Sequence, residues 1–232
     1  MRFACALAAA LLLAGLPAAG PPAAGLPAAG LPAAAAPESE AGYPPTGDVT
    51  YAVLRNGDQI GTHEMDFTRD GDRYKVVTKI NIAVTVLGVT FFRFVTDSDE
   101  VWVDGKFASF VAKTDYDGKL HDVTVRPAGG GLAVADNGVT TVASGDPLPG
   151  TLWNPASLKA TQLIDPTDGT LKRVQVIDRG TEQIIVRGRP VTARHVSFLG
   201  ELQREVWYGP DDRIVHIEYL GPDGSLVVTE LR

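Results

Sequence analysis

Apolar and polar residues alternate along most of the chain from residue 48 onward. In the stretch 79–86, for example, Ile80, Ile82 and Val84 alternate with polar or small residues. A period of two places successive side chains on opposite faces of a β-strand, so the pattern predicts strands with one buried face. It predicts strands near 48–55, 59–68, 73–86, 89–103, 106–115, 119–126, 132–135, 139–143, 170–178, 181–187, 190–199, 202–208, 213–220 and 225–231.

Seven Asn-Gly or Asp-Gly pairs lie between these segments. Both residue types tolerate the positive φ angles that tight hairpin turns require. The pairs begin at Asn56, Asp70, Asp104, Asp117, Asn137, Asp168 and Asp223. Alternating segments joined by such turns predict an all-β fold, an antiparallel meander. Because the segments 73–86 and 89–103 exceed the usual strand length, we expect them to bend and form a curled sheet or an open barrel.

The segment 151–166 lacks the strand pattern. Asn154 is a favoured helix N-cap residue, and Pro155 follows at the first helical position, where proline is best tolerated. Trp153, directly before the cap, is placed to form a hydrophobic staple with the first turns. We therefore expect one short helix near 154–164. A second interpretation is functional, since a helix over one end of a curled sheet would place Trp153 at the mouth of a cavity.

The first 42 residues differ in composition from the rest. Arg2 precedes a run of about a dozen apolar residues followed by small residues, which is the pattern of a secretory signal peptide. The run is too short to cross a bilayer, so we expect no transmembrane anchor after cleavage. We assign 1–25 to a signal peptide whose cleavage site stays open, 26–42 to an Ala/Pro/Gly-rich linker and 43–232 to a single antiparallel β domain. The protein is then exported, either periplasmic or secreted.

Composition narrows the classes of function. The only cysteine, Cys5, lies within the predicted signal peptide, which removes disulfides, thiolate metal sites and cysteine nucleophiles. The formal charge is −7 with no basic run, which argues against nucleic acid as a partner. The sequence contains no G-x-S-x-G elbow, no H-E-x-x-H and no P-loop. We therefore assign no catalytic residue, no metal and no cofactor.

The segment around His216 carries the strongest candidate chemistry. If the ends of the loop 208–213 pair, Glu205 faces His216 on the neighbouring strand, and Trp207 and Glu218 lie on the same side of the sheet. Such a Glu–His pair suits a general base, a metal site or a polar ligand contact. We favour an ordinary cross-strand pair on a solvated face, because a slip of one residue in the hairpin separates the two side chains.

Several segments together resemble a known family. They are RNGDQIGTH, EVWVDGKFASF, TDYDGKLHDVTV, LWNP and REVWYGPDDRIVHIEY. Their combination resembles a family of exported bacterial β-domain proteins of unknown function over most of residues 48–231. More distantly, the architecture is similar to the half-barrels of periplasmic lipoprotein carriers, whose concave face holds acyl chains. This second similarity implies a curled sheet, and architecture alone does not fix function.

We therefore expect a non-enzymatic envelope protein that binds an apolar or amphipathic ligand, such as a lipid, in a curved β-sheet. The long strands motivate this expectation because they carry many apolar side chains between residues 80 and 94. The candidate ligand-binding residues are Trp153, Asn154, Trp207, Glu205 and His216. Two alternatives stay open: a structural or protein-interaction module of the envelope, and a hydrolase that uses the Glu205–His216 pair.

Overall fold

The computed structural model describes residues 43–232, and the predicted signal peptide and linker lie outside the described residues. The strands are β1 (Gly47–Arg55), β2 (Asp58–Asp70), β3 (Arg73–Val86), β4 (Val89–Val103), β5 (Lys106–Tyr116), β6 (Lys119–Ala128), β7 (Gly131–Asp136), β8 (Val139–Ser144), β9 (Leu148–Pro149), β10 (Gln162–Ile164), β11 (Leu171–Val186), β12 (Arg189–Gly200), β13 (Arg204–Tyr208), β14 (Ile214–Leu220) and β15 (Leu226–Leu231). The predicted all-β class is therefore confirmed. Between residues 43 and 232, no helix is long and apolar enough to cross a membrane.

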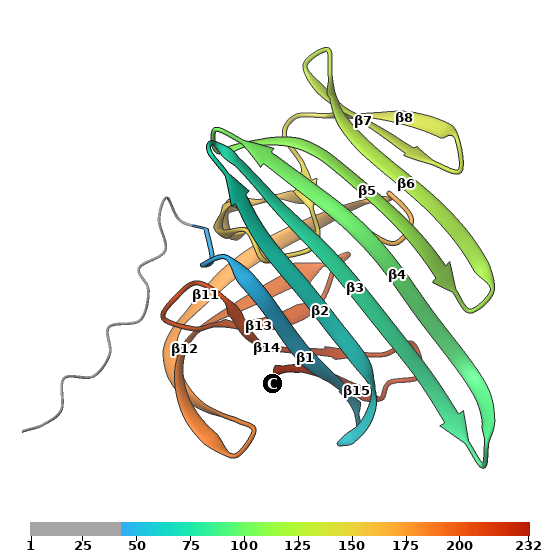
Figure 1. Cartoon of the computed structure of the whole chain (residues 1–232), viewed down its shortest axis with the longest axis vertical. Helices are drawn as coiled ribbons and strands as arrows, with labels where there is room; N and C mark the ends of the chain where they lie inside the picture. Colours follow the sequence, from blue (N-terminus) through green and yellow to red (C-terminus); the bar gives the residue numbers. More distant parts are fainter. Residues whose placement is uncertain (1–42) are drawn as a thin grey trace, which may run out of the picture. The chain divides into compact units, whose positions relative to one another are not determined.

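All strands belong to one sheet, in the order β8-β7-β6-β5-β4-β3-β2-β1-β15-β14-β13-β12-β11-β10-β9. The first arm, β1–β8, and the second arm, β9–β15, meet where β1 pairs with β15. Neighbours are antiparallel except β9 and β10, which are parallel. Only three residues separate the edge strands β8 and β9, which puts Ser144 and Leu148 at most about 15 Å apart. The sheet is thus curled and barrel-like without closing (Figure 1).

Each of the seven Asn-Gly and Asp-Gly pairs lies in a connection between two antiparallel neighbours of the sheet. At four of them both residues have positive φ, beginning with Asn56, Asp104, Asp117 and Asn137. The hairpin between β3 and β4 reaches the same geometry with Leu87 and Gly88, at φ angles of 49° and 81°. The predicted hairpin turns are therefore confirmed. The exceptions in residue type are this Leu-Gly turn and the Arg187-Gly188 turn between β11 and β12, whose φ angles are 51° and 74°.

The separate strands predicted at 170–178 and 181–187 form one strand, β11. Gly180 lies between the two predicted segments, and its φ of 89° accommodates a β-bulge. The pairing with β12 shifts register between Asp178 and Gly180 and then continues to the end of the strand. The bulge reverses the faces of the side chains that follow it, so Glu182 lies on the face of His195.

The short helix predicted near 154–164 is not confirmed. A five-residue 3-10 helix spans Pro155–Lys159, and Asn154 caps it by accepting a hydrogen bond from the backbone N–H of Ala156 at 2.8 Å. The next residue, Ala160, has extended geometry, and Gln162–Ile164 pair with β9 and β11 as strand β10. A helix this short gains few backbone hydrogen bonds, so pairing at the sheet edge replaces its second half.

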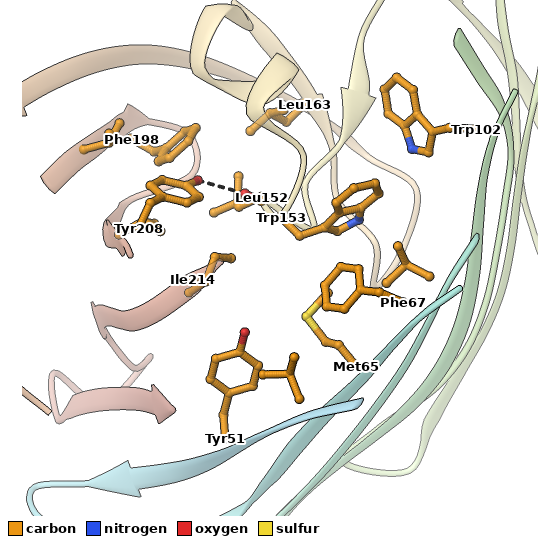
Figure 2. Close-up of a cluster of buried hydrophobic side chains, with 14 of the residues drawn as sticks. Tyr51, Met65, Phe67, Trp102, Leu152, Trp153, Leu163, Phe198, Tyr208 and Ile214 are labelled. Carbon is orange, nitrogen blue, oxygen red and sulfur yellow. Dashed lines mark hydrogen bonds between the residues drawn. The ribbon is translucent and has the colours of Figure 1, made fainter. Parts of the chain in front are cut away.

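The main core lies on the inner face of the sheet, between the two arms. Its buried members are Val49, Tyr51, Met65, Phe67, Tyr74, Val76, Trp102, Leu152, Trp153, Leu163, Val174, Val196, Phe198, Val206, Tyr208 and Ile214. Figure 2 shows Leu152 and Trp153 between side chains of the first arm and side chains of the second. The Tyr208 hydroxyl donates a hydrogen bond to the Leu152 carbonyl at 2.8 Å. The segment that links the two edges therefore fills this end of the curl.

Candidate functional site

Trp153 lies at the centre of the main core, with 1% of its surface exposed. Its ring packs on Tyr74, with centroids 5.6 Å apart, and edge-on against Phe67 and Trp102 at 5.8 and 6.2 Å. Aromatic pairs at these separations stabilise a core beyond their buried area. Trp153 thus belongs to the core and lines no cavity mouth.

Glu100, on β4, ties this tryptophan to the first arm. Its buried carboxylate accepts hydrogen bonds from Trp102 Nε1 at 2.7 Å, Thr151 Oγ1 at 2.8 Å and Trp153 Nε1 at 2.9 Å. Burial raises the pKa of Glu100, and the three hydrogen bonds oppose that rise. A carboxylate with three short donors is satisfied within the protein, so Glu100 acts as an anchor for residues 151–153.

Asn154 and the other predicted ligand-binding residues lie in different places. The Asn154 side chain is used as the cap described above, and its Nδ2 is buried without a hydrogen-bond partner. Glu205, Trp207 and His216 lie on the outer face, because their neighbours in sequence face the main core. The structure therefore does not bring the five predicted residues into one site.

The predicted pairing of Glu205 with His216 is wrong. Trp207 lies opposite His216 and Glu205 lies opposite Glu218, because the β13–β14 register shifts between Trp207 and Tyr208. The bulge adds one residue on β14, which is the slip to which the prediction was sensitive. The four side chains do share one face, as predicted, and His216 Nε2 lies 2.8 Å from Glu218 Oε1.

The partner of Glu205 is His195, on the neighbouring strand β12. His195 Nε2 lies 2.7 Å from Glu205 Oε2, and Nδ1 lies 3.0 Å from Glu182 Oε1. Its ring stacks on Trp207 with centroids 4.2 Å apart. No pattern in the sequence pointed to His195 or Glu182 as site residues. Alternation within β12 placed His195 on a face, but its partners depend on the β12–β13 register and on the bulge in β11.

The outer-face cluster is a poor arrangement for acid–base catalysis. A general base needs a free ring nitrogen within reach of substrate, whereas both nitrogens of His195 contact carboxylates. The hydroxyl of Ser197 donates to Glu205 Oε2 at 2.6 Å, so it is bound to a carboxylate and not to a histidine. Among residues 43–232, no group of three or more His, Cys, Asp or Glu side chains is suited to hold a metal ion.

The inner face has a different character at its other end, near the β3–β4 and β14–β15 hairpins. Of the four apolar clusters within residues 43–232, the one here has the fewest buried members, Val53, Ile82 and Val227. Its other members are partly buried: Ile60, Ile80, Phe92, Phe94 and Tyr219. We call this cluster the open end. The rings of Phe92 and Phe94 lie edge-on to Tyr116, at 5.5 and 6.0 Å.

A band of small polar side chains crosses the inner face of the first arm between the open end and the main core. The Thr96 and Thr114 hydroxyls are 2.8 Å apart on neighbouring strands, and His121 Nδ1 lies 2.8 Å from Asp136 Oδ2. Thr78 and Ser98 lie opposite each other in the same band. Along the inner face, the buried apolar main core is therefore followed by the polar band and then by the open end, which is apolar and partly exposed.

Arg204 adds a positive charge to the inner face of the second arm. It opens β13 opposite Phe198, a member of the main core. Its guanidinium carbon lies 3.9 Å from the centroid of the Tyr219 ring, which is a cation–π contact. The open end is thus bordered by hydroxyl groups on one arm and by an arginine on the other.

Comparison with known proteins supports the fold and the family. No curated protein matches the sequence. One similar solved structure is the crystal structure of a beta-barrel-like protein of the domain of unknown function DUF1849 from Brucella abortus. It has 13% sequence identity and a TM-score of 0.55, and the match covers 82% of this chain and 96% of that one. At this identity the likeness shows the fold alone.

The sequence itself matches the model of a domain of unknown function, DUF6134, over residues 51–232. The expected resemblance to a β-domain family of unknown function is therefore confirmed, over nearly the whole of the described domain. The chain belongs to the DUF6134 family.

Proposed function

We propose that this protein is a non-enzymatic envelope protein that binds an apolar or amphipathic ligand on the inner face, at the open end. One observation carries the proposal. Both ends of the inner face are apolar, but only the end around Trp153 is filled, while Ile60, Phe92 and Phe94 keep part of their surface exposed.

Covering those side chains would stabilise a complex. Removing apolar surface from water contributes roughly 25 cal/mol per Å². The polar band between the two ends gives an amphipathic ligand a second kind of surface, because the Thr96 and Thr114 hydroxyls can donate and accept hydrogen bonds. A molecule with an apolar chain and a small polar group suits both surfaces.

The proposed location rests on the N-terminal sequence. Residues 1–25 have the pattern of a signal peptide, and the charge of −7 offers no basic surface for nucleic acid. A ligand such as a lipid is abundant in a bacterial envelope. The proposed function therefore combines export, expected from residues 1–25, with a sheet whose apolar inner surface is partly exposed.

The test is native mass spectrometry of the protein expressed from the full chain, purified from a bacterial envelope without detergent and followed by organic extraction. We expect a reproducible added mass that extraction identifies as a lipid or another apolar molecule. Phe94→Gln should reduce the ligand-bound fraction, because Phe94 belongs to the open end. Phe91→Gln is the matched control, since Phe91 is 66% exposed and outside that cluster. A clean mass with no uptake of added lipids would contradict the proposal.

A second candidate function is that of an interaction module, favoured by the edge strand β8. Among residues 43–232 this strand pairs with β7 alone, and Val139 and Val142 are 73% and 70% exposed on it. Unprotected edges with apolar side chains can accept a strand from a partner. Val142→Lys should then weaken any measured association without changing lipid uptake. The hydrolase alternative loses its basis, because Glu205 and His216 do not pair.

A further inference from the structure

Arg204 is the charged side chain that best distinguishes possible ligands of the inner face. Four other arginines have a carboxylate partner: Arg55 with Asp223, Arg173 with Glu201, Arg194 with Asp178 and Arg213 with Asp211. In the part of the chain that the structure describes, Arg204 has no carboxylate within ion-pair distance. Its one side-chain hydrogen bond runs from Nη1 to the Gln203 carbonyl at 2.7 Å.

The surroundings of Arg204 do not neutralise its charge. The charge of Asp165 acts on it from a longer distance, but Asp165 has Lys172 Nζ 3.8 Å from its own carboxylate. Arg204 is partly buried, and burial lowers the pKa of its guanidinium. A guanidinium has five N–H donors, so most of the donors of Arg204 remain available to an anion.

The same arginine is next to the apolar surface. Its Tyr219 partner belongs to the open end, the apolar cluster that also contains Phe92 and Phe94. Tyr116, on the other arm, contacts both phenylalanines. An anionic group held at Arg204 would therefore have its apolar chain beside Tyr219, in the cluster that includes the phenylalanines of the first arm.

We propose that the ligand of the inner face is an anionic amphiphile, whose carboxylate or phosphate group binds Arg204 while its apolar chain lies against the open end. This inference rests on the proposed ligand-binding function and names the class of ligand. The planar guanidinium suits both anions, because it can donate two parallel hydrogen bonds to either one.

The test is isothermal titration calorimetry of the full chain with three ligands of equal chain length: dodecanoate, dodecyl phosphate and 1-dodecanol, each below its solubility or micelle limit. We expect both anions to bind roughly tenfold or more tightly than the alcohol. Arg204→Gln should remove that preference, so that the three ligands bind with similar affinities. Arg204→Lys keeps the positive charge but loses the planar group that donates two parallel hydrogen bonds, so it should retain part of the preference for anions.

Arg173→Gln is the matched control, because it removes one positive charge from an exposed ion pair and should leave all three affinities unchanged. Equal binding of anions and alcohol by the unaltered chain overturns the inference and leaves the proposed function standing. Absence of binding by all three ligands overturns the proposed function. Circular dichroism establishes whether each variant is folded. If Arg204→Gln unfolds, the unaltered chain and Arg204→Lys still decide the question.

Discussion

The substitution Trp153→Phe tests whether the residue is a core anchor or a ligand contact. It removes the indole N–H that donates to Glu100 Oε2 at 2.9 Å and leaves the hydrogen bonds from Trp102 and Thr151 in place. The substitution also shrinks a ring that is 1% exposed, at the centre of the main core.

The expected loss of stability follows from these two changes. A hydrogen bond to a charged group contributes about 1.5–3 kcal/mol. The smaller ring also leaves a cavity in the core, and a cavity of this size adds about 1 kcal/mol to the loss of stability. We therefore expect Trp153→Phe to lower the free energy of unfolding by about 3 kcal/mol, measured by urea denaturation followed by far-UV circular dichroism.

Two further variants separate the hydrogen bond from the change in size. Trp207→Phe is the matched control, since Trp207 Nε1 donates to Glu182, whose side chain is half exposed. Trp207→Phe should lower the free energy of unfolding by at least about 1 kcal/mol less than Trp153→Phe, because water can replace the lost hydrogen-bond donor at the half-exposed Glu182. In a double-mutant cycle, Trp153→Phe and Glu100→Gln should show a coupling of about 1 kcal/mol or more.

Trp153 is not an anchor of the core if Trp153→Phe costs no more stability than Trp207→Phe and shows no coupling to Glu100→Gln. Loss of ligand binding with unchanged stability would also contradict the anchor role, because Trp153 would then act on the ligand directly.

Two other predictions concern single positions. Leu87 is fully exposed with a φ of 49°, so Leu87→Asn should raise the free energy of unfolding by about 1 kcal/mol, and an unchanged urea midpoint would contradict this. Burial lowers the pKa of His63 from 6.5 to about 4, and its Nε2 is buried without a hydrogen-bond partner. The unfolded chain therefore binds the proton first, so this stability is complete above pH 6.5 and is lost as the pH falls towards 4. Denaturation at pH 7 and pH 5 should show that His63→Gln reduces the acid-induced loss by about 2 kcal/mol, and an equal loss in both proteins would count against it.

The candidate site was only partly predictable from sequence. Alternation predicted that Glu205, Trp207, His216 and Glu218 share a face, because the direction of a side chain in a strand is a local property. Which of them meet was not predictable, because one inserted residue at the β13–β14 bulge changes every pair beyond it. The role proposed for Arg204 could not be predicted from the sequence, because it depends on the burial of this side chain and on its contact with Tyr219.

The sequence by itself determined the strands and the turns between them. Period-two alternation and Asn-Gly or Asp-Gly pairs act within a few residues, so they specify hairpins without reference to the rest of the chain. Only the tertiary structure decided that the segment after β8 crosses to the other edge of the sheet and places Trp153 on Glu100. It also decided that one end of the inner face is filled and the other is not. Alternation makes a face apolar, but what covers that face depends on segments distant in the sequence.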